Sequence, residues 1–210
     1  MIGRLLSAVS FAGLGYALPL LGSAALAHDF RPWLAMTSAC LLVFAQPTLS
    51  KEEARATRAR DRGSAPLIMA LSLVSQIAAS LELRAGTAVS AGAVCGGVAL
   101  VLLGSAIRVA AIRTLGKAFT ASVRVDADHR LVQHGLYRRL RHPSYLGALL
   151  ALLGVPVLFS AWWAAAFTLL AMSFAYTLRI RLEEHALLER HGAAYHEYRA
   201  RTAMLIPGLW

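Results

Sequence analysis

Long runs without Lys, Arg, Asp or Glu divide the chain into segments of membrane length. Four of these runs have the length of one bilayer-spanning helix, about 20 residues. They are 5–28, 32–50, 63–81 and 85–107. A fifth run, 142–178, is too long for one span and is interrupted by Pro156. We interpret it as a helical hairpin with arms 144–159 and 162–178. The pattern predicts an all-α integral membrane protein with four transmembrane helices and a C-terminal helical hairpin.

The first apolar run has a second interpretation as a secretory signal peptide. Arg4 precedes it, and Ala25-Leu26-Ala27 resembles a cleavage site. The run is longer than the apolar core of most signal peptides, and the next run follows almost at once. We therefore favour a transmembrane helix.

Composition and charge agree with a membrane protein and give it an orientation. Hydrophobic residues make up 58% and charged residues 15% of the chain, against ~45–50% and ~25% in soluble domains. The net charge is +10, and every basic residue except Arg31 and Arg84 falls on one side of the predicted topology. The positive-inside rule places that side in the cytoplasm. We expect both termini and the active site there. The Ala- and Arg-rich composition favours a prokaryotic inner or plasma membrane.

Nucleic-acid binding is disfavoured, because the basic residues lie on short segments beside the membrane with little aromatic interleaving. Attraction to anionic lipid is an alternative role for the basic loop 51–62. Cys40 and Cys95 are isolated within predicted spans, which fits neither a disulfide framework nor a metal site. Gly92, Gly96 and Gly97 in the fourth span fit close helix contact.

The residues that can carry chemistry lie in the second half of the chain. We divide the protein into a transmembrane scaffold, 1–112, with its fourth helix over 85–112, and a catalytic region, 113–210. The catalytic region contains the hairpin, 144–182, and a C-terminal amphipathic helix. Residues 113–142 form a longer connection than most loops, and we expect this segment to fold onto the cytosolic membrane face.

Two polar clusters flank the hairpin. His142-Pro143-Ser144-Tyr145 opens it, and the free N–H groups of a first turn that begins with proline form a weak anion site. Plain helix initiation at a membrane boundary is the alternative. Arg179 and Glu183 are i,i+4 neighbours where the second arm leaves the bilayer. They form either a surface ion pair or, since charges near membrane depth are costly, part of a ligand site. Tyr195 and Tyr198 share one face of an amphipathic helix, which lies on headgroups or contacts the ligand.

The ordered motifs of residues 115–209 resemble the isoprenylcysteine carboxyl methyltransferase family and the related phospholipid methyltransferases. The matching pieces are His129-Arg-Leu-Val132, His134-Gly-Leu-Tyr137, Arg141-His-Pro-Ser-Tyr-Leu-Gly147, Arg179 with Glu183-Glu184, and Gly192-x-x-Tyr195-x-x-Tyr198-x-x-Arg201 before Pro207-Gly208. Each piece is weak alone, whereas their common order is specific.

The resemblance implies an S-adenosylmethionine-dependent membrane methyltransferase. It also implies a cytosolic cofactor-binding segment. The cofactor contacts are expected at His129, Leu131, Val132, Tyr137, His142, Pro143, Ser144, Tyr145 and Glu183. The family's arginine near the substrate carboxylate falls on Arg179, as catalytic and substrate-binding residue. The expected partners are membrane lipid and a lipophilic or lipidated acceptor, most simply a carboxylate. An amine, thiol or phenol acceptor stays open, and an amine or thiol would need a base such as His142 or Glu184.

Two other interpretations stay open. One is a membrane reductase of the sterol-reductase type that binds NADPH. The Glu183-Glu184 pair disfavours it, because a dinucleotide phosphate calls for Arg or Lys. The other is a non-catalytic membrane protein of the same fold.

Overall fold

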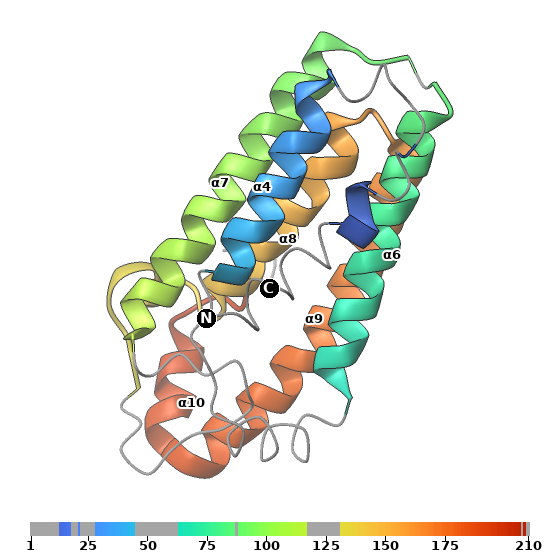
Figure 1. Ribbon diagram of the computed structural model, residues 1–210. Coiled ribbons are helices and arrows are strands. Elements are labelled where there is room, and N and C mark those ends of the chain that lie inside the picture. Colours follow the sequence, from blue (N-terminus) through green and yellow to red (C-terminus); the bar gives the residue numbers. More distant parts are fainter. Residues whose placement is uncertain are drawn as a thin grey trace.

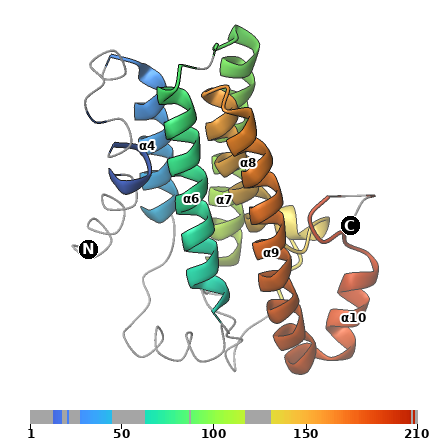
Figure 2. The same cartoon turned by 90° about the vertical axis from the view of Figure 1, so that its right-hand side faces the viewer.

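The computed structural model describes residues 13–17, 21, 28–44, 63–86, 88–116, 131–206 and 208. Its helices are η1 Gly13–Ala17, α4 Phe30–Phe44, α6 Ser64–Arg84, α7 Ala91–Leu115, η3 Gly135–Arg138, α8 Pro143–Leu158, α9 Trp162–His191 and α10 Ala193–Ala200. The long helices form an elongated bundle, and α10 folds across one end of it (Figures 1 and 2).

The structure confirms the expected fold class, a helical membrane protein. Among the described residues, α6, α7 and α9 are long and apolar enough to cross a membrane, whereas α8, with 16 residues, is apolar but shorter. The first predicted span lies mostly outside the described residues, and α4 has 15 residues. The count of four transmembrane helices therefore stays a prediction. Helix α9 continues to His191, beyond the expected end of the hairpin at 182.

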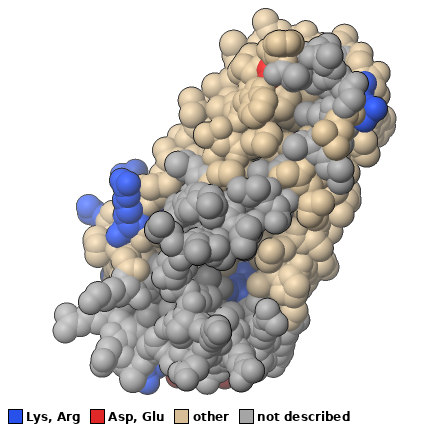
Figure 3. Space-filling model, viewed as in Figure 1, with Lys and Arg blue, Asp and Glu red and all other residues tan. Residues whose placement is uncertain are grey.

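The helices alternate in direction, so that their termini gather at two ends of the bundle. The start of α6, the end of α7, the start of α8 and the end of α9 share the end that α10 covers (Figure 1). On the face in Figure 3, the visible charged atoms lie toward the lower part and at the upper edge, and the described surface between them is uncharged. A bundle with an apolar middle and polar ends matches the two solvents of a membrane protein.

Short irregular turns set the connections around α8 and α9. Pro143 occupies the first turn of α8, where its missing N–H leaves no hydrogen bond unmade. Ser160 has a φ of 56° and reverses the chain between the two helices. Gly192 has a φ of 51° between α9 and α10, in the left-handed region that glycine adopts at little cost.

Helices α7 and α8 form the most extensive contact in the described part of the chain. A Cβ atom added at Gly104 would lie 2.3 Å from the backbone nitrogen of Ala151, and one at Gly97 would lie 2.3 Å from that of Leu158. The helices thus meet backbone to backbone, as small residues permit in membranes. Of the three glycines expected at a close contact, Gly97 makes one. Gly92 and Gly96 face open space in the described structure, so the expectation was wrong for them.

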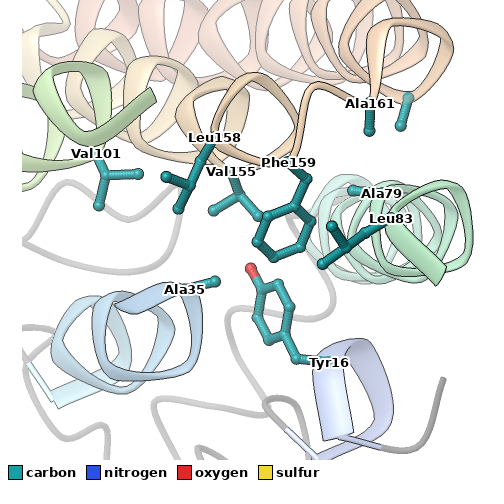
Figure 4. Packing of buried hydrophobic residues seen from close by; sticks show 10 residues of the cluster. Tyr16, Ala35, Ala79, Leu83, Val101, Val155, Leu158, Phe159 and Ala161 are labelled. Carbon is teal, nitrogen blue, oxygen red and sulfur yellow. The ribbon is translucent and has the colours of Figure 1, made fainter. Parts of the chain in front are cut away.

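Of the two apolar core clusters that the described residues form, one lies at the end of the bundle away from α10. Phe159 is fully buried and packs in a cluster with Tyr16, Leu83 and Val155 (Figure 4). These residues come from η1, α6 and α8 with its following turn, so the cluster joins the N-terminal helices to the α8–α9 turn. It anchors one end of α8. The other end combines polar contacts with a second apolar cluster. That cluster includes Ala148, Met172 and Leu205.

Candidate active site

The start of α8 is held in place by the C-terminal segment that follows α10. The Arg141 backbone N–H donates to the Ala203 carbonyl at 2.8 Å, and the His142 N–H donates to the Met204 carbonyl at 3.1 Å. His142 is buried at the boundary between this segment and the helix. These two backbone hydrogen bonds therefore fix the position of the first turn of α8 relative to the C-terminal segment.

Glu184 of α9 joins this turn to the C-terminal segment. Its Oε1 accepts from Arg141 Nε at 2.8 Å and lies 3.4 Å from His142 Nε2, while its Oε2 lies 3.6 Å from Arg199 Nε. Arg141 also donates to the Thr202 carbonyl. A carboxylate surrounded by three basic side chains, with 11% of its side chain exposed, is a structural anchor in this protein. It is poorly suited to act as a base, because its cationic neighbours stabilise the ionised form.

Glu183 lies one residue earlier and faces a different set of groups. Its Oε1 accepts from the Tyr145 hydroxyl and, at 3.1 Å, from Arg179 Nε. Its Oε2 lies 3.7 Å from His142 Nδ1. Arg179 is buried in α9 and also donates from Nη1 to the Ser64 hydroxyl at 3.0 Å. Glu183 is more exposed than Glu184, with 20% of its side chain accessible, so it is the carboxylate of the pair that a ligand can reach.

Aromatic rings surround this cluster. The rings of Tyr145 and Tyr176 are 5.2 Å apart between centroids. Tyr137 is buried in η3, and its carbonyl accepts a hydrogen bond of 2.7 Å from the Tyr198 hydroxyl. Burial raises the pKa of Tyr198 to about 12, which keeps the phenol protonated as the donor of this bond. Tyr195 and Tyr198 are both buried and face the protein, so α10 binds the bundle through its tyrosines.

The structure brings most of the sequence-predicted residues to one end of the bundle. Tyr137, His142, Pro143 and Ser144 are buried there. Tyr145, Arg179 and Glu183 share hydrogen bonds, so the expected ion pair belongs to a three-residue cluster in which Arg179 is buried and the other two are half-buried. Leu131 and Val132 are half-buried. His129 lies outside the described residues. The roles of all these residues stay predictions.

Two residues of this region, Ser64 and Arg108, were missed as candidates. Ser64 accepts a hydrogen bond from Arg179. Arg108 of α7 donates to the Ser144 carbonyl at 3.1 Å and to the Ser144 hydroxyl at 3.2 Å. A signal existed for Arg108, since it is the first charged residue after the fourth apolar run. Ser64 carries no comparable signal, because its partner lies 115 positions away.

Fold and site together define a helical membrane protein with a buried cluster of ionisable and aromatic side chains at one end of its bundle. Residues 97–189 match the family model of the isoprenylcysteine carboxyl methyltransferase (ICMT) family. This stretch contains the start of α8, Arg179 and both glutamates, and it confirms the resemblance that the sequence motifs indicate.

Curated relatives agree with that match. The chain is 35% identical over 114 residues to a probable protein-S-isoprenylcysteine O-methyltransferase of Oryza sativa subsp. indica, covering 53% of this chain and 59% of the relative. It is 37% identical over 114 residues to protein-S-isoprenylcysteine O-methyltransferase A of Arabidopsis thaliana, covering 53% and 57%. The match thus spans less than two thirds of these relatives. Both are eukaryotic, so the expected prokaryotic membrane stays a prediction.

The fold is similar to that of a solved structure, a eukaryotic intramembrane Ras methyltransferase, ICMT. The TM-score is 0.59 at 21% sequence identity, and the match covers 96% of this chain and 75% of the other. The similarity includes the N-terminal helices, for which the sequence offers no motif. It shows that the described helices have the arrangement of an ICMT membrane fold.

Proposed function

We propose that the protein is an S-adenosylmethionine-dependent methyltransferase that methylates a lipophilic acceptor, most simply at a carboxylate. The observation that carries this proposal is the cluster of Glu183, Tyr145 and Arg179 beside His142. It lies within the segment that matches the ICMT family. Relatives named for isoprenylcysteine O-methylation support the same reaction class.

The residues of the cluster suit the methyl donor. S-adenosylmethionine supplies an electrophilic methyl group on a cationic sulfonium, and it also carries an ammonium and hydroxyls. Glu183 offers a partly exposed carboxylate for a cationic or hydroxyl group. Tyr145 and Tyr137 offer ring faces that attract a cation. The set of one carboxylate and several tyrosines therefore fits this cofactor better than an anionic dinucleotide phosphate.

Arg179 is the residue that we assign to the acceptor. Its guanidinium is buried beside Glu183 and Tyr145, and a planar guanidinium orients a carboxylate through paired hydrogen bonds. A carboxylate needs no base to attack a methyl group, so alignment and exclusion of water are what the protein has to supply. Glu184, paired with Arg141, is not required as a base for this acceptor.

The membrane position gives each substrate its own route. We propose that 113–210 form the catalytic region on the cytosolic side, and that the scaffold 1–112 holds it at the bilayer. The polar methyl donor arrives from the cytosol, and the lipophilic acceptor arrives from the bilayer. Exposed apolar side chains of α9, such as Leu170 and Phe174, suit the approach of such an acceptor from the bilayer. An enzyme with this access would methylate lipophilic acids in preference to water-soluble ones.

Thermal unfolding of the purified protein in detergent tests the proposal. S-adenosylhomocysteine at 100 times its dissociation constant should add about 2.7 kcal/mol of stability, and NADPH should add none. Arg179→Ala should keep the stabilisation and lose turnover. A folded protein that is stabilised by NADPH alone, or by neither ligand, would refute the methyltransferase assignment.

A further inference from the structure

Arg108 is a basic residue of α7 that faces the first turn of α8. One nitrogen of its guanidinium, Nη1, makes both hydrogen bonds to Ser144, one to the carbonyl and one to the hydroxyl. From Ala91 to Ile107 the helix carries no charged side chain. An arginine in a helix long enough to span the membrane is costly and tends to mark a binding site.

Arg108 differs from Arg179 in its electrostatic partners. Arg179 pairs with Glu183 at 3.1 Å. Among the described residues, no carboxylate lies within ion-pair distance of Arg108, and its hydrogen bonds go to neutral oxygens of Ser144 through Nη1. A guanidinium carries five N–H donors in a fork that matches a carboxylate. Arg108 is therefore a half-buried cation whose charge is not neutralised by the part of the chain that the structure describes.

The packing of α7 on α8 holds Arg108 in the site. A Cβ atom at Gly147 would lie 2.6 Å from the Arg108 backbone nitrogen, so this part of α7 touches the second turn of α8 directly. The Arg108 charge acts on the phenols of Tyr137 and Tyr145. For Tyr137, burial raises the pKa, the Glu183 carboxylate raises it further, and the Arg108 charge opposes the rise. The Arg108 charge is thus close enough to act on two tyrosines of the candidate cofactor site.

We propose that Arg108 is a further binding residue of the site and that its guanidinium binds a substrate carboxylate. This inference rests on the proposed methyl transfer, which brings two carboxylates into one site: that of the methyl donor's amino acid and that of the acceptor. Arg179 is assigned to the acceptor. The expected source for Arg108 is therefore the carboxylate of S-adenosylmethionine, next to the first turn of α8.

Binding measurements with and without that carboxylate test the proposal. The wild-type protein should bind S-adenosylhomocysteine at least tenfold more tightly than its decarboxylated analogue, S-adenosyl-3-thiopropylamine, because a charge-assisted hydrogen bond is lost. In Arg108→Gln this preference should fall to near one. Arg108→Lys keeps the charge without the fork and should show an intermediate preference. If Arg108→Gln does not fold, the preference of Arg108→Lys is compared with that of the wild type instead.

Arg113→Gln is the matched control, since Arg113 is an exposed basic residue of the same helix. It should retain the wild-type preference. If Arg108 binds the acceptor instead, Arg108→Gln and Arg113→Gln will both bind S-adenosylhomocysteine as the wild type does. Arg108→Gln, but not Arg113→Gln, will then raise the KM for an S-farnesylcysteine acid about tenfold. This outcome also supports the proposal and reassigns the source of the carboxylate.

Two outcomes would overturn the proposal in distinguishable ways. If the wild type binds S-adenosylhomocysteine and Arg108→Gln changes neither the preference nor the KM, Arg108 serves only as a cap for Ser144, and the proposed function stands. If the folded wild type neither binds S-adenosylhomocysteine nor methylates the acceptor, the proposed function fails, and the carboxylate proposal fails with it.

Discussion

The first turn of α8 and the remainder of the same helix are held by opposite kinds of contact. The first turn lies among Arg141, Glu184 and Arg108, with charged and hydrogen-bonded partners from three directions. The remainder lies against α7 through Gly104 and Gly154, with backbone nearly touching backbone. One end of a single helix is thus polar and the rest is apolar and closely packed.

This difference separates what positions the site from what the site does. Close packing in a membrane gives stability without any polar group. Buried ion pairs often contribute little net stability, because desolvation offsets their attraction. A cluster of several charges at the start of α8 is therefore not explained by folding alone. The glycine contact holds the helix and Glu184 anchors its first turn, whereas Glu183 and Arg108 are the charged residues expected to bind ligands.

Gly104→Leu should be the most damaging change in the apolar part. Its Cβ would already lie 2.3 Å from the Ala151 nitrogen and 2.6 Å from the Gly147 carbonyl oxygen, so α7 and α8 would have to separate. Overpacking of this kind costs about 3 kcal/mol or more. Unfolding in mixed micelles measures the cost, and Gly104→Ala provides a milder version if the leucine variant does not fold.

Gly96→Ala is the control on the same helix. Nothing lies within 4 Å of an added Cβ there, and alanine favours a helix over glycine by about 0.5–1 kcal/mol. The expected result is unchanged or slightly raised stability. Equal losses from Gly96→Ala and Gly104→Ala would mean that the close α7–α8 contact does not exist.

Glu184→Ala should have the largest effect on stability in the polar part. It would leave Arg141 and the buried His142 without their shared carboxylate. Removing one partner of a buried pair costs about 3 kcal/mol or more. The expected loss is somewhat smaller, about 2–3 kcal/mol, since Arg141 keeps its hydrogen bonds to the carbonyls of Arg199 and Thr202. Denaturation without ligand is the measurement, and a loss below about 0.5 kcal/mol would contradict the anchoring role.

Glu183→Gln should affect ligand binding more than it affects the stability of the free protein, in contrast to Glu184→Ala. Glutamine keeps an amide oxygen that can accept from Tyr145 and Arg179, so the free protein should lose only about 1–2 kcal/mol of stability. The stabilisation of about 2.7 kcal/mol expected from S-adenosylhomocysteine should disappear. Thermal unfolding with and without ligand gives both numbers. Retained stabilisation in this variant would remove Glu183 from the cofactor site.

The periodic and ordered features of the chain were open to prediction from sequence. Charge-free runs predicted α6 and α7, because a bilayer demands about 20 apolar residues. The motif from Arg141 to Tyr145 predicted where α8 begins. The i,i+4 spacing of Arg179 and Glu183 predicted their contact, since one helix turn brings such residues together.

Contacts between distant segments could not be predicted in this way. The pairing of Glu184 with Arg141 and Arg199 depends on how α10 folds back across the bundle, which no local pattern encodes. For the same reason, the glycine spacing in α7 did not reveal that Gly97 and Gly104 face α8 while Gly92 and Gly96 do not. Helix rotation is set by the partner helix, which a single sequence does not specify.

Ser160→Gly should give the smallest change, and it is a gain. Ser160 lies in the turn after α8, at the apolar end of that helix. Its φ is 56°, a conformation that costs a non-glycine residue about 1–2 kcal/mol. Its buried hydroxyl has no hydrogen-bond partner in the described structure, so nothing offsets that cost. Glycine's extra freedom in the unfolded chain removes part of the benefit, which leaves about 0.5–1 kcal/mol. The gain should appear in unfolding without ligand and leave S-adenosylhomocysteine binding unchanged, because the turn and the charged end of α8 lie at opposite ends of the helix. A loss of stability would show that the hydroxyl is hydrogen-bonded, and that this turn also depends on a polar contact.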